Sequence, residues 1–256
     1  MTPLQNYYNK IYTEDNRLSK SNKHKTEFIL TTDYIDKYLK EGMKILELGA
    51  GTGIYSLLYA SKGYQVDALE YIEENLDILK SKITEDMKIN PVLGDARDLS
   101  MYQDNTFDMV LNLGPLYHLE GEQREKTIQE AKRVCKKGGL IYFAYISNNL
   151  TFVKCVKKFD NYVTEYKEEI AEGFRLKDSQ DVFTFMYPNQ MEELAKKYYL
   201  SKVHHLTTDG ISSLLIERIN ELPEDQFNVW IEYLRTTAQR EDQLGYGEHL
   251  LYIARK

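Results

Sequence analysis

The sequence predicts an α/β fold with a mostly parallel central sheet. Short apolar segments alternate with helical segments over residues 43–147, and glycine-containing turns separate several of them. Strands that alternate with helices are joined by right-handed crossovers, and such crossovers give parallel strand pairs. We therefore expect a seven-stranded, mostly parallel sheet with helices on its faces.

The elements of this core follow from the spacing of the apolar residues. A helical periodicity predicts an N-terminal helix over 23–40, which Glu41-Gly42 ends. Apolar runs bounded by turn residues predict five strands, at 43–48, 64–70, 89–93, 107–113 and 140–146. Helical patterns predict three helices between these strands, at 54–61, 72–83 and 123–135.

After Asn148-Asn149 the regular alternation stops. Helices are expected at 151–171, 189–198, 211–222 and 223–240, with Pro223 suited to the first turn of the last one. An extended segment is expected at 181–187, and the last two strands at 200–206 and 248–254. The predicted units are an N-terminal helical cap or lid (1–42), the core (43–147), an insertion (148–188) and the remaining core with a helical insertion between its last strands (189–256).

Composition narrows the class of protein. Of the 256 residues, 42% are hydrophobic and 29% charged, which is ordinary for a soluble globular chain, and no apolar run approaches the ~20 residues of a membrane helix. The net charge of −7 disfavours attraction to a phosphate backbone. The first residues show no secretion signal. Cys135 and Cys155 lack metal-ligand spacing, so we expect two buried thiols in a cytoplasmic protein with no metal.

A glycine-rich loop, Glu47-Leu-Gly49-Ala-Gly51-Thr-Gly53, lies between the first predicted strand and the first predicted helix. Glycine allows positive φ and lets the backbone approach a ligand, while the helix N-terminus offers free amide donors. The dinucleotide fingerprint needs its third glycine at position 54, which is Ile54 here. The spacing therefore disfavours a nicotinamide dehydrogenase.

The loop closely resembles motif I of the class I methyltransferases, and the chain is similar to their methyltransferase type 11-like family. The resemblance implies a Rossmann-like fold, S-adenosylmethionine as cofactor, and Glu47 near the methionine amino group, directly or through water. Glu70 ends the second predicted strand about 20 residues after Gly49, the separation at which an acidic side chain meets ribose hydroxyls. A carboxylate suits this role because it accepts from two hydroxyls at once.

Three further segments resemble motifs of the same family. Gly94-Asp95-Ala96 is similar to its adenine-binding turn, and 107–119 to its fourth-strand motif, whose end faces the sulfonium. Lys137-Gly138-Gly139 matches the turn before the fifth strand. The cofactor-binding residues implied by the resemblance are Glu47, Gly49, Ala50, Gly51, Gly53, Glu70, Tyr71, Gly94, Asp95, Ala96, Asn112 and Leu113.

A sulfonium is already activated, so alignment of acceptor and methyl group does most of the catalysis and a general base is optional. His118 is the candidate base because it follows the fourth predicted strand. Its alternative role is structural, with the ring bonded to the backbone and shaping the loop. The other histidines carry less weight, and His204 and His205 are expected on opposite faces of one strand.

Two segments could cover the site. The N-terminal stretch Tyr7-Tyr8-Asn9-Lys10-Ile11-Tyr12, with Arg17 beyond it, is either a lid over the cofactor or packing at the sheet edge. The insertion is expected to roof the acceptor pocket, although its aromatic residues would equally suit a packed core. These residues are Tyr162, Tyr166, Phe174, Phe183, Phe185 and Tyr187.

Three functions are compatible with these features. The favoured one is transfer of a methyl group to a small-molecule acceptor, given the acidic charge and the predicted roof. RNA or protein methylation would need a basic surface patch, and no Asn-Pro-Pro-Tyr-type motif follows the fourth predicted strand. The third is a protein that binds S-adenosylmethionine without transferring its methyl group.

Overall fold

The computed structural model describes residues 2–10, 14–171, 176, 178 and 182–256. Its strands are β1 Lys44–Leu48, β2 Gln65–Glu70, β3 Ile89–Leu93, β4 Phe107–Asn112, β5 Cys135–Ser147, β6 Phe185–Met186, β7 Ser201–Thr207 and β8 His249–Arg255. Its longer helices are α1 Pro3–Lys10, α2 Asn22–Asp36, α3 Ile54–Ser61, α4 Glu73–Ser81, α5 Gly121–Val134, α6 Asn148–Lys158, α9 Pro188–Lys197 and α11 Glu224–Thr237. Its short helical turns are η1 Pro115–Tyr117, α7 Tyr162–Glu165, α8 Lys167–Ala171, η2 Gly210–Ser213, α10 Ile216–Asn220 and α12 Glu241–Leu244.

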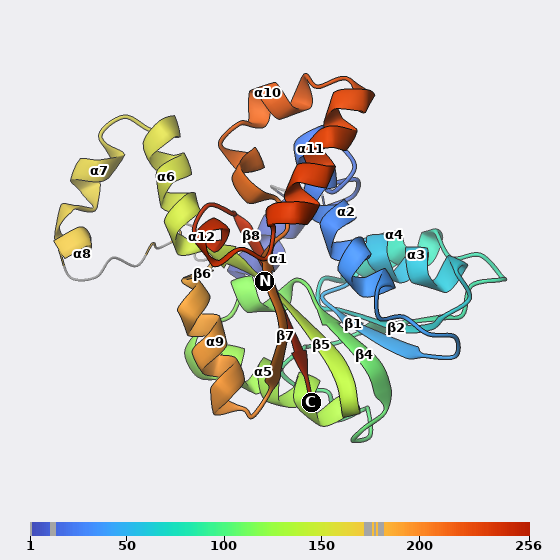
Figure 1. Cartoon of the computed structure of the whole chain (residues 1–256). Coiled ribbons are helices and arrows are strands. Elements are labelled where there is room, and N and C mark those ends of the chain that lie inside the picture. Colours follow the sequence, from blue (N-terminus) through green and yellow to red (C-terminus); the bar gives the residue numbers. More distant parts are fainter. Residues whose placement is uncertain (1, 11–13, 172–175, 177, 179–181) are drawn as a thin grey trace.

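One sheet organises the molecule (Figure 1). Seven strands follow the order β3-β2-β1-β4-β5-β8-β7, and the two-residue strand β6 also pairs with β5. The pairs among β1 to β6 are parallel, whereas β8 runs antiparallel to both β5 and β7. The predicted mostly parallel sheet is thus confirmed, with the short β6 as an eighth strand.

Alternating side chains of the central strands divide the core between two faces. On one face Leu46, Val110 and Ile141 pack with apolar residues of α5 and α9. On the other face Ile45 and Met109 pack with residues of α2, α3 and α11. The sheet is therefore covered by helices on both sides, and its strand ends remain available for a ligand site.

The glycines before the fifth strand differ from the expected turn. β5 starts at Cys135, which pairs with Phe107, and the register then shifts before Met109 pairs with Leu140. Lys137-Gly138-Gly139 therefore forms an irregularity inside the strand. Gly138 has a φ of +78°, and a Cβ on Gly139 would lie 2.8 Å from the Asp108 carbonyl oxygen, so both positions suit glycine.

The second half of the chain departs more from its predicted elements. The single helix expected at 151–171 is three helices, and Asn161, with a φ of 63°, precedes the second of them. The helix expected at 211–222 is divided into η2 and α10. Pro223 is extended (φ −61°, ψ 161°) and caps α11 instead of lying inside it. Of the extended segment expected at 181–187, only Phe185–Met186 forms a strand, and residue 181 lies outside the described residues.

Both cysteines are free thiols, as expected. Cys135 is buried, but Cys155 on α6 is only half-buried, so the expectation of two buried thiols is wrong for Cys155. Among the described residues, no helix combines the length and the apolar character needed to cross a bilayer.

Candidate active site

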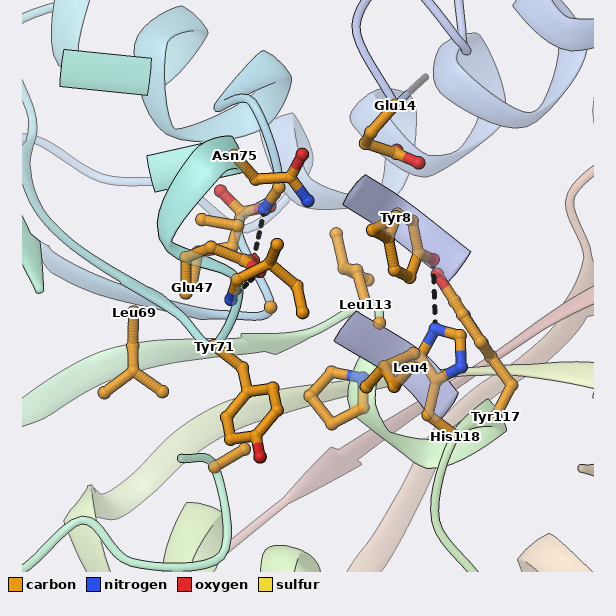
Figure 2. Close-up of a pocket in the computed structure, with 18 of the residues that line it drawn as sticks. Leu4, Tyr8, Glu14, Glu47, Leu69, Tyr71, Asn75, Leu113, Tyr117 and His118 are labelled. Carbon is orange, nitrogen blue, oxygen red and sulfur yellow. Dashed lines mark hydrogen bonds between the residues drawn. The ribbon is translucent and has the colours of Figure 1, made fainter. Parts of the chain in front are cut away.

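A cavity of about 310 Å³ opens at the carboxyl ends of β1, β2 and β4 (Figure 2). Residues 113–123, after β4, line one side of it, and two further parts of the chain enclose the rest. One is the wall formed by the glycine-rich loop and the ends of β2 and β3, which we call the glycine-rich wall (residues 47–97). The other is the N-terminal segment with α1, which we call the N-terminal cover (residues 2–10 and 14–18).

The glycines of the loop let its backbone form the floor of the cavity. Gly49 and Gly51 have φ values of +72° and +56°, which favour glycine. A Cβ on Gly49 would lie 2.9 Å from Cδ of Pro115, and one on Gly51 would lie 3.1 Å from Cγ of Glu14. Side chains at these positions would therefore fill the space where the loop faces the rest of the site.

Two buried carboxyl groups lie at the ends of adjacent strands. Glu47 on β1 is 2% exposed. It accepts a hydrogen bond from the Ser56 hydroxyl, which partly offsets the effect of burial on its pKa. Burial and the neighbouring Glu70 nevertheless raise the pKa of Glu47 to about 8. Glu70, at the end of β2, accepts from the backbone N–H groups of Gly51 (2.7 Å) and Ile72 (2.8 Å). Burial raises the pKa of Glu70 as well, against the effect of these amides.

The turn after β3 completes the glycine-rich wall. The Asp95 carboxylate accepts from the backbone N–H of Arg97 (2.8 Å) and from its Nε (2.9 Å). A Cβ on Gly94 would lie 2.8 Å from Cδ1 of Leu69, so this close approach also suits glycine. Both Asp95 and Leu69 face the cavity, which gives this end one charged and one apolar surface.

His118 forms the side of the cavity opposite this turn, after η1. Its Nδ1 lies 2.8 Å from the Val182 carbonyl oxygen and its Nε2 lies 3.1 Å from the Tyr8 hydroxyl of α1. Burial lowers the pKa of His118 to about 4, so the imidazole is neutral near pH 7. The ring also lies against Phe183, with centroids 5.0 Å apart.

The N-terminal cover is held by an ion pair of Asp15 with Lys82 and by contacts at two further places. At the first, Tyr8 bonds to His118, and the Tyr7 ring meets the Phe183 ring edge-on at 5.4 Å between centroids. At the second, Arg17 lies between two carboxylates, at 3.0 Å from Glu14 and 2.8 Å from Glu27. In Figure 2, Tyr8 and Glu14 lie on the side of the view away from Leu69 and Tyr71.

A cluster of partly buried charges extends from Arg17. Burial acts to raise the pKa of Glu27, but Arg17 and His249 lower it to about 2. His249 Nδ1 lies 2.9 Å from Asp209 and 3.6 Å from Glu27. Burial acts to lower the pKa of His249, and these carboxylates outweigh it, so the pKa is raised. We call Arg17, Glu27, Asp209 and His249 the anchor cluster, because they connect the cover to the start of β8.

Most of the predicted site residues meet at this cavity. Those that line it are Glu47, Gly49, Ala50, Gly51, Glu70, Tyr71, Gly94, Asp95, Ala96, Leu113 and His118. Gly53 and Asn112 do not line it. Gly53 faces α4, where a Cβ would lie 2.7 Å from Cγ of Leu79. Asn112 is 0% exposed on the strand face of Val110, and its amide has no hydrogen-bond partner among the described residues.

Sequence reasoning missed part of the lining. The missed residues are Thr2, Pro3, Leu4, Glu14, Leu18, Ile54, Tyr55, Leu69, Ile72, Asn75, Arg97, Gly114, Pro115, Tyr117, Leu119 and Gln123. No described residue of 148–188 lines the cavity, and Phe174 lies outside the described residues. The end of the insertion instead contacts His118, through the Val182 carbonyl oxygen and the Phe183 ring. Of the two segments that could cover the site, the N-terminal one contributes Thr2, Pro3, Leu4 and Tyr8 to the lining.

Comparison with known proteins agrees with this architecture. Residues 46–143 match the methyltransferase domain family. A cypemycin N-terminal methyltransferase from a Streptomyces species is 36% identical over 104 residues, which are 40% of this chain and 41% of that protein. A demethylmenaquinone methyltransferase from Paenarthrobacter aurescens is 31% identical over 58% of this chain and 54% of that protein. The chain thus spans about half the length of these relatives or less.

Solved structures extend the likeness to the whole fold. A possible histamine N-methyltransferase from Thermotoga maritima superposes with a TM-score of 0.60 at 16% identity, covering 99% of this chain and 98% of that one. An S-adenosylmethionine-dependent methyltransferase from Methanosarcina mazei gives 0.58 at 19% identity, covering 87% and 96%. The matched residues 46–143 therefore form a methyltransferase domain, and the whole chain has the Rossmann-like class I fold of S-adenosylmethionine-dependent methyltransferases.

Proposed function

We propose that the cavity holds S-adenosylmethionine against the glycine-rich wall and that the chain methylates a small-molecule acceptor beneath the N-terminal cover. One observation carries this proposal: the cavity is lined by the glycine-rich loop and by α1 together. A site that is walled by one part of the chain and covered by another suits a compact acceptor better than a polymer.

The residues of the wall fit the parts of the cofactor. Glu47 would hold the methionine amino group, Glu70 the ribose hydroxyls, and Asp95 the adenine amine. Glu70 keeps this capacity because each of its oxygens receives one backbone N–H, and a carboxylate oxygen has a further lone pair. Gly49 and Gly51 line the cavity with backbone alone, which lets a ligand approach the loop closely. When bound, the cofactor supplies a methyl group on a positively charged sulfur.

The chain itself contributes alignment and exclusion of water. Leu113 at the end of β4, with Tyr117 and His118 after it, forms the side of the cavity that meets the cover. An acceptor held there between fixed groups loses less freedom in the reaction, which is the main source of rate enhancement for a displacement of this kind. The neutral imidazole of His118 is able to accept a proton from an acceptor.

Relatives support a small acceptor without identifying it. The names of two of them, demethylmenaquinone methyltransferase and ubiquinone biosynthesis O-methyltransferase, refer to quinone metabolism. Another relative is named for the uracil of 23S ribosomal RNA, so RNA methylation is the competing function. The net charge of −7 favours the small molecule, because it gives no general attraction to a polyanion.

Two measurements test the proposal. Calorimetry should show binding of S-adenosylmethionine and S-adenosylhomocysteine but not of NAD, and tighter binding of NAD would contradict it. Incubation of the enzyme with total cell extract and radiolabelled S-adenosylmethionine should place the label in the low-mass fraction. If the label enters chiefly RNA or protein, the acceptor is a polymer and the proposal of a small-molecule acceptor is wrong.

A further inference from the structure

The contacts of His118 fix which ring nitrogen carries its proton. Nδ1 lies 2.8 Å from the carbonyl oxygen of Val182, and a carbonyl only accepts hydrogen bonds. Nδ1 must therefore donate, and in the neutral ring Nε2 then presents a lone pair. At 3.1 Å from Nε2, the Tyr8 hydroxyl is the donor of the second bond. The order of donors is thus Tyr8 to His118 to the Val182 carbonyl.

Tyr8 and His118 thus form a hydrogen-bonded pair at the cavity, in which Tyr8 is the donor and His118 Nε2 the acceptor. Both residues line it, and Figure 2 shows the Tyr8 hydroxyl meeting the His118 ring. A hydroxyl that donates its hydrogen can accept another at its oxygen. A donor on a bound acceptor can therefore be connected through Tyr8 to the lone pair of His118.

We propose that Tyr8 relays a proton from the methyl acceptor to His118, so that the N-terminal cover supplies a catalytic group. The inference rests on the proposed function, and it requires an acceptor that carries an O–H or N–H at the reacting atom. The Tyr8 hydroxyl takes the acceptor's proton and gives its own to Nε2. The acceptor atom forms its bond to the methyl carbon, while the electron pair of the broken carbon–sulfur bond stays on sulfur.

The surroundings of the pair suit these roles. Burial lowers the pKa of His118 to about 4, so near pH 7 the ring is neutral and can receive the proton. Burial also raises the pKa of Tyr8 well above 10, so the hydroxyl keeps a proton to give. After the transfer both ring nitrogens of His118 carry a proton, and the bond from Nδ1 to Val182 remains in place.

The relay is assembled only when the cover lies over the cavity. Tyr8 belongs to α1 and His118 follows η1, which are far apart in the sequence. Tyr7, beside Tyr8, packs edge-on against Phe183, which also contacts the His118 ring. Phe183 and Val182 of the insertion thus hold both members of the pair, so a bound acceptor would meet the relay only under a closed cover.

Tyr8→Phe tests the relay because it removes one hydroxyl and keeps the ring. We expect the rate of label transfer from S-adenosylmethionine, measured in whichever extract fraction the wild type labels, to fall by about 10²-fold. Affinity for S-adenosylhomocysteine should change by less than about twofold. His118→Gln should give a similar loss, and the double variant should be no slower than either single one, because the residues act as a unit. Tyr7→Phe is the matched control and should stay within about twofold of the wild type.

Two readouts separate the relay from a merely structural contact. The loss in Tyr8→Phe should shrink as pH rises, because an acceptor that loses its proton to solvent no longer needs the relay. A loss of equal size at every pH overturns the proposal. In ¹⁵N-histidine spectra, His118 should be the Nδ1–H tautomer with a hydrogen-bonded Nε2, and Tyr8→Phe should shift only the Nε2 signal. A protonated Nε2 in the neutral ring also overturns it.

The outcomes distinguish failure of the relay from failure of the proposed function. Wild-type enzyme that labels no fraction of the extract overturns both. Wild-type enzyme that labels a fraction while Tyr8→Phe labels it equally fast overturns the relay alone.

Discussion

The two sides of the cavity are built in different ways. The glycine-rich wall comes from consecutive strand–turn–helix units, and its shape follows from glycines at positive φ and from carboxyl groups at the ends of adjacent strands. The N-terminal cover is held by contacts between distant parts of the chain, among them Tyr8 on His118, Tyr7 on Phe183 and Arg17 in the anchor cluster. Changes in the wall should therefore affect cofactor affinity, whereas changes in the anchor should affect the cover and overall stability.

The largest effect is expected from Arg17→Ala, which leaves Glu27 buried without its main partner. Removing one member of a buried ion pair costs about 3–5 kcal/mol. Because the Arg17 and Glu27 side chains are 17% and 14% exposed, urea unfolding should show a decrease in the free energy of unfolding near the lower end of this range. Arg240→Ala is the matched control, because Arg240 forms an exposed pair with Asp242 that is worth at most about 1 kcal/mol. Equal losses of unfolding free energy in the two variants would show that the ion pairs of Arg17 stabilise the fold no more than an exposed pair does.

On the opposite side, Glu70→Ala should weaken binding of S-adenosylhomocysteine by about 1–3 kcal/mol, because ribose hydroxyls would lose a charged acceptor. Calorimetry measures the affinity, and thermal unfolding without ligand checks that the loop has kept its fold. Glu73→Ala is the control, since Glu73 is an exposed carboxyl group at the start of α4. Unchanged affinity in Glu70→Ala would exclude Glu70 from the cofactor site.

A smaller effect concerns pH and the anchor cluster. The pKa of His249 is raised in the folded protein, so its stabilising contribution is complete below its unfolded pKa of about 6.5 and is lost as pH rises through the folded value. The charged groups facing it are Glu27, Asp209 and Glu248. The difference in unfolding free energy between the wild type and His249→Gln should therefore be larger at pH 6 than at pH 9. A difference that grows toward pH 9 would contradict a raised pKa of His249 in the folded protein.

The smallest effect is the release of a proton when the cofactor binds. With a pKa of about 8, Glu47 is largely protonated at pH 7. A methionine ammonium beside it would favour the carboxylate, so binding should release up to about one proton per site. Calorimetry in buffers of different ionisation enthalpy measures this number, and Glu47→Gln should abolish it. Equal proton release in both proteins would place the amino group away from Glu47.

The wall was predictable because its determinants are local. The helix at 54–61 and the strand at 89–93 occur at their predicted boundaries, since glycines and apolar runs define both. Glu47, Glu70 and Asp95 lie at the carboxyl ends of parallel strands, and that topology brings them to one edge. The exception is Asn112, where the alternation of side chains along β4 turns the amide to the other face.

The cover was not predictable in the same way. Tyr8 and His118 meet across more than a hundred residues, and Glu27 meets His249 across most of the chain. Neither pair leaves a pattern of spacing in one sequence. The aromatic residues of the insertion indicated a roof, but aromatic side chains equally suit packing, and Phe183 in fact packs behind His118. Composition alone does not distinguish these two arrangements.

The antiparallel strand β8 has a consequence for the order of folding. β7 pairs only with β8 in the described sheet, so it reaches the other strands through β8. The ribosome nevertheless makes β7 first, followed by about forty residues of helix and turn before β8. A nascent chain can thus pair β1 to β5 while β7 waits unpaired, and this interval exposes a strand edge to association with other chains. The end of the sheet beside the anchor cluster can therefore form only after β8 has been made.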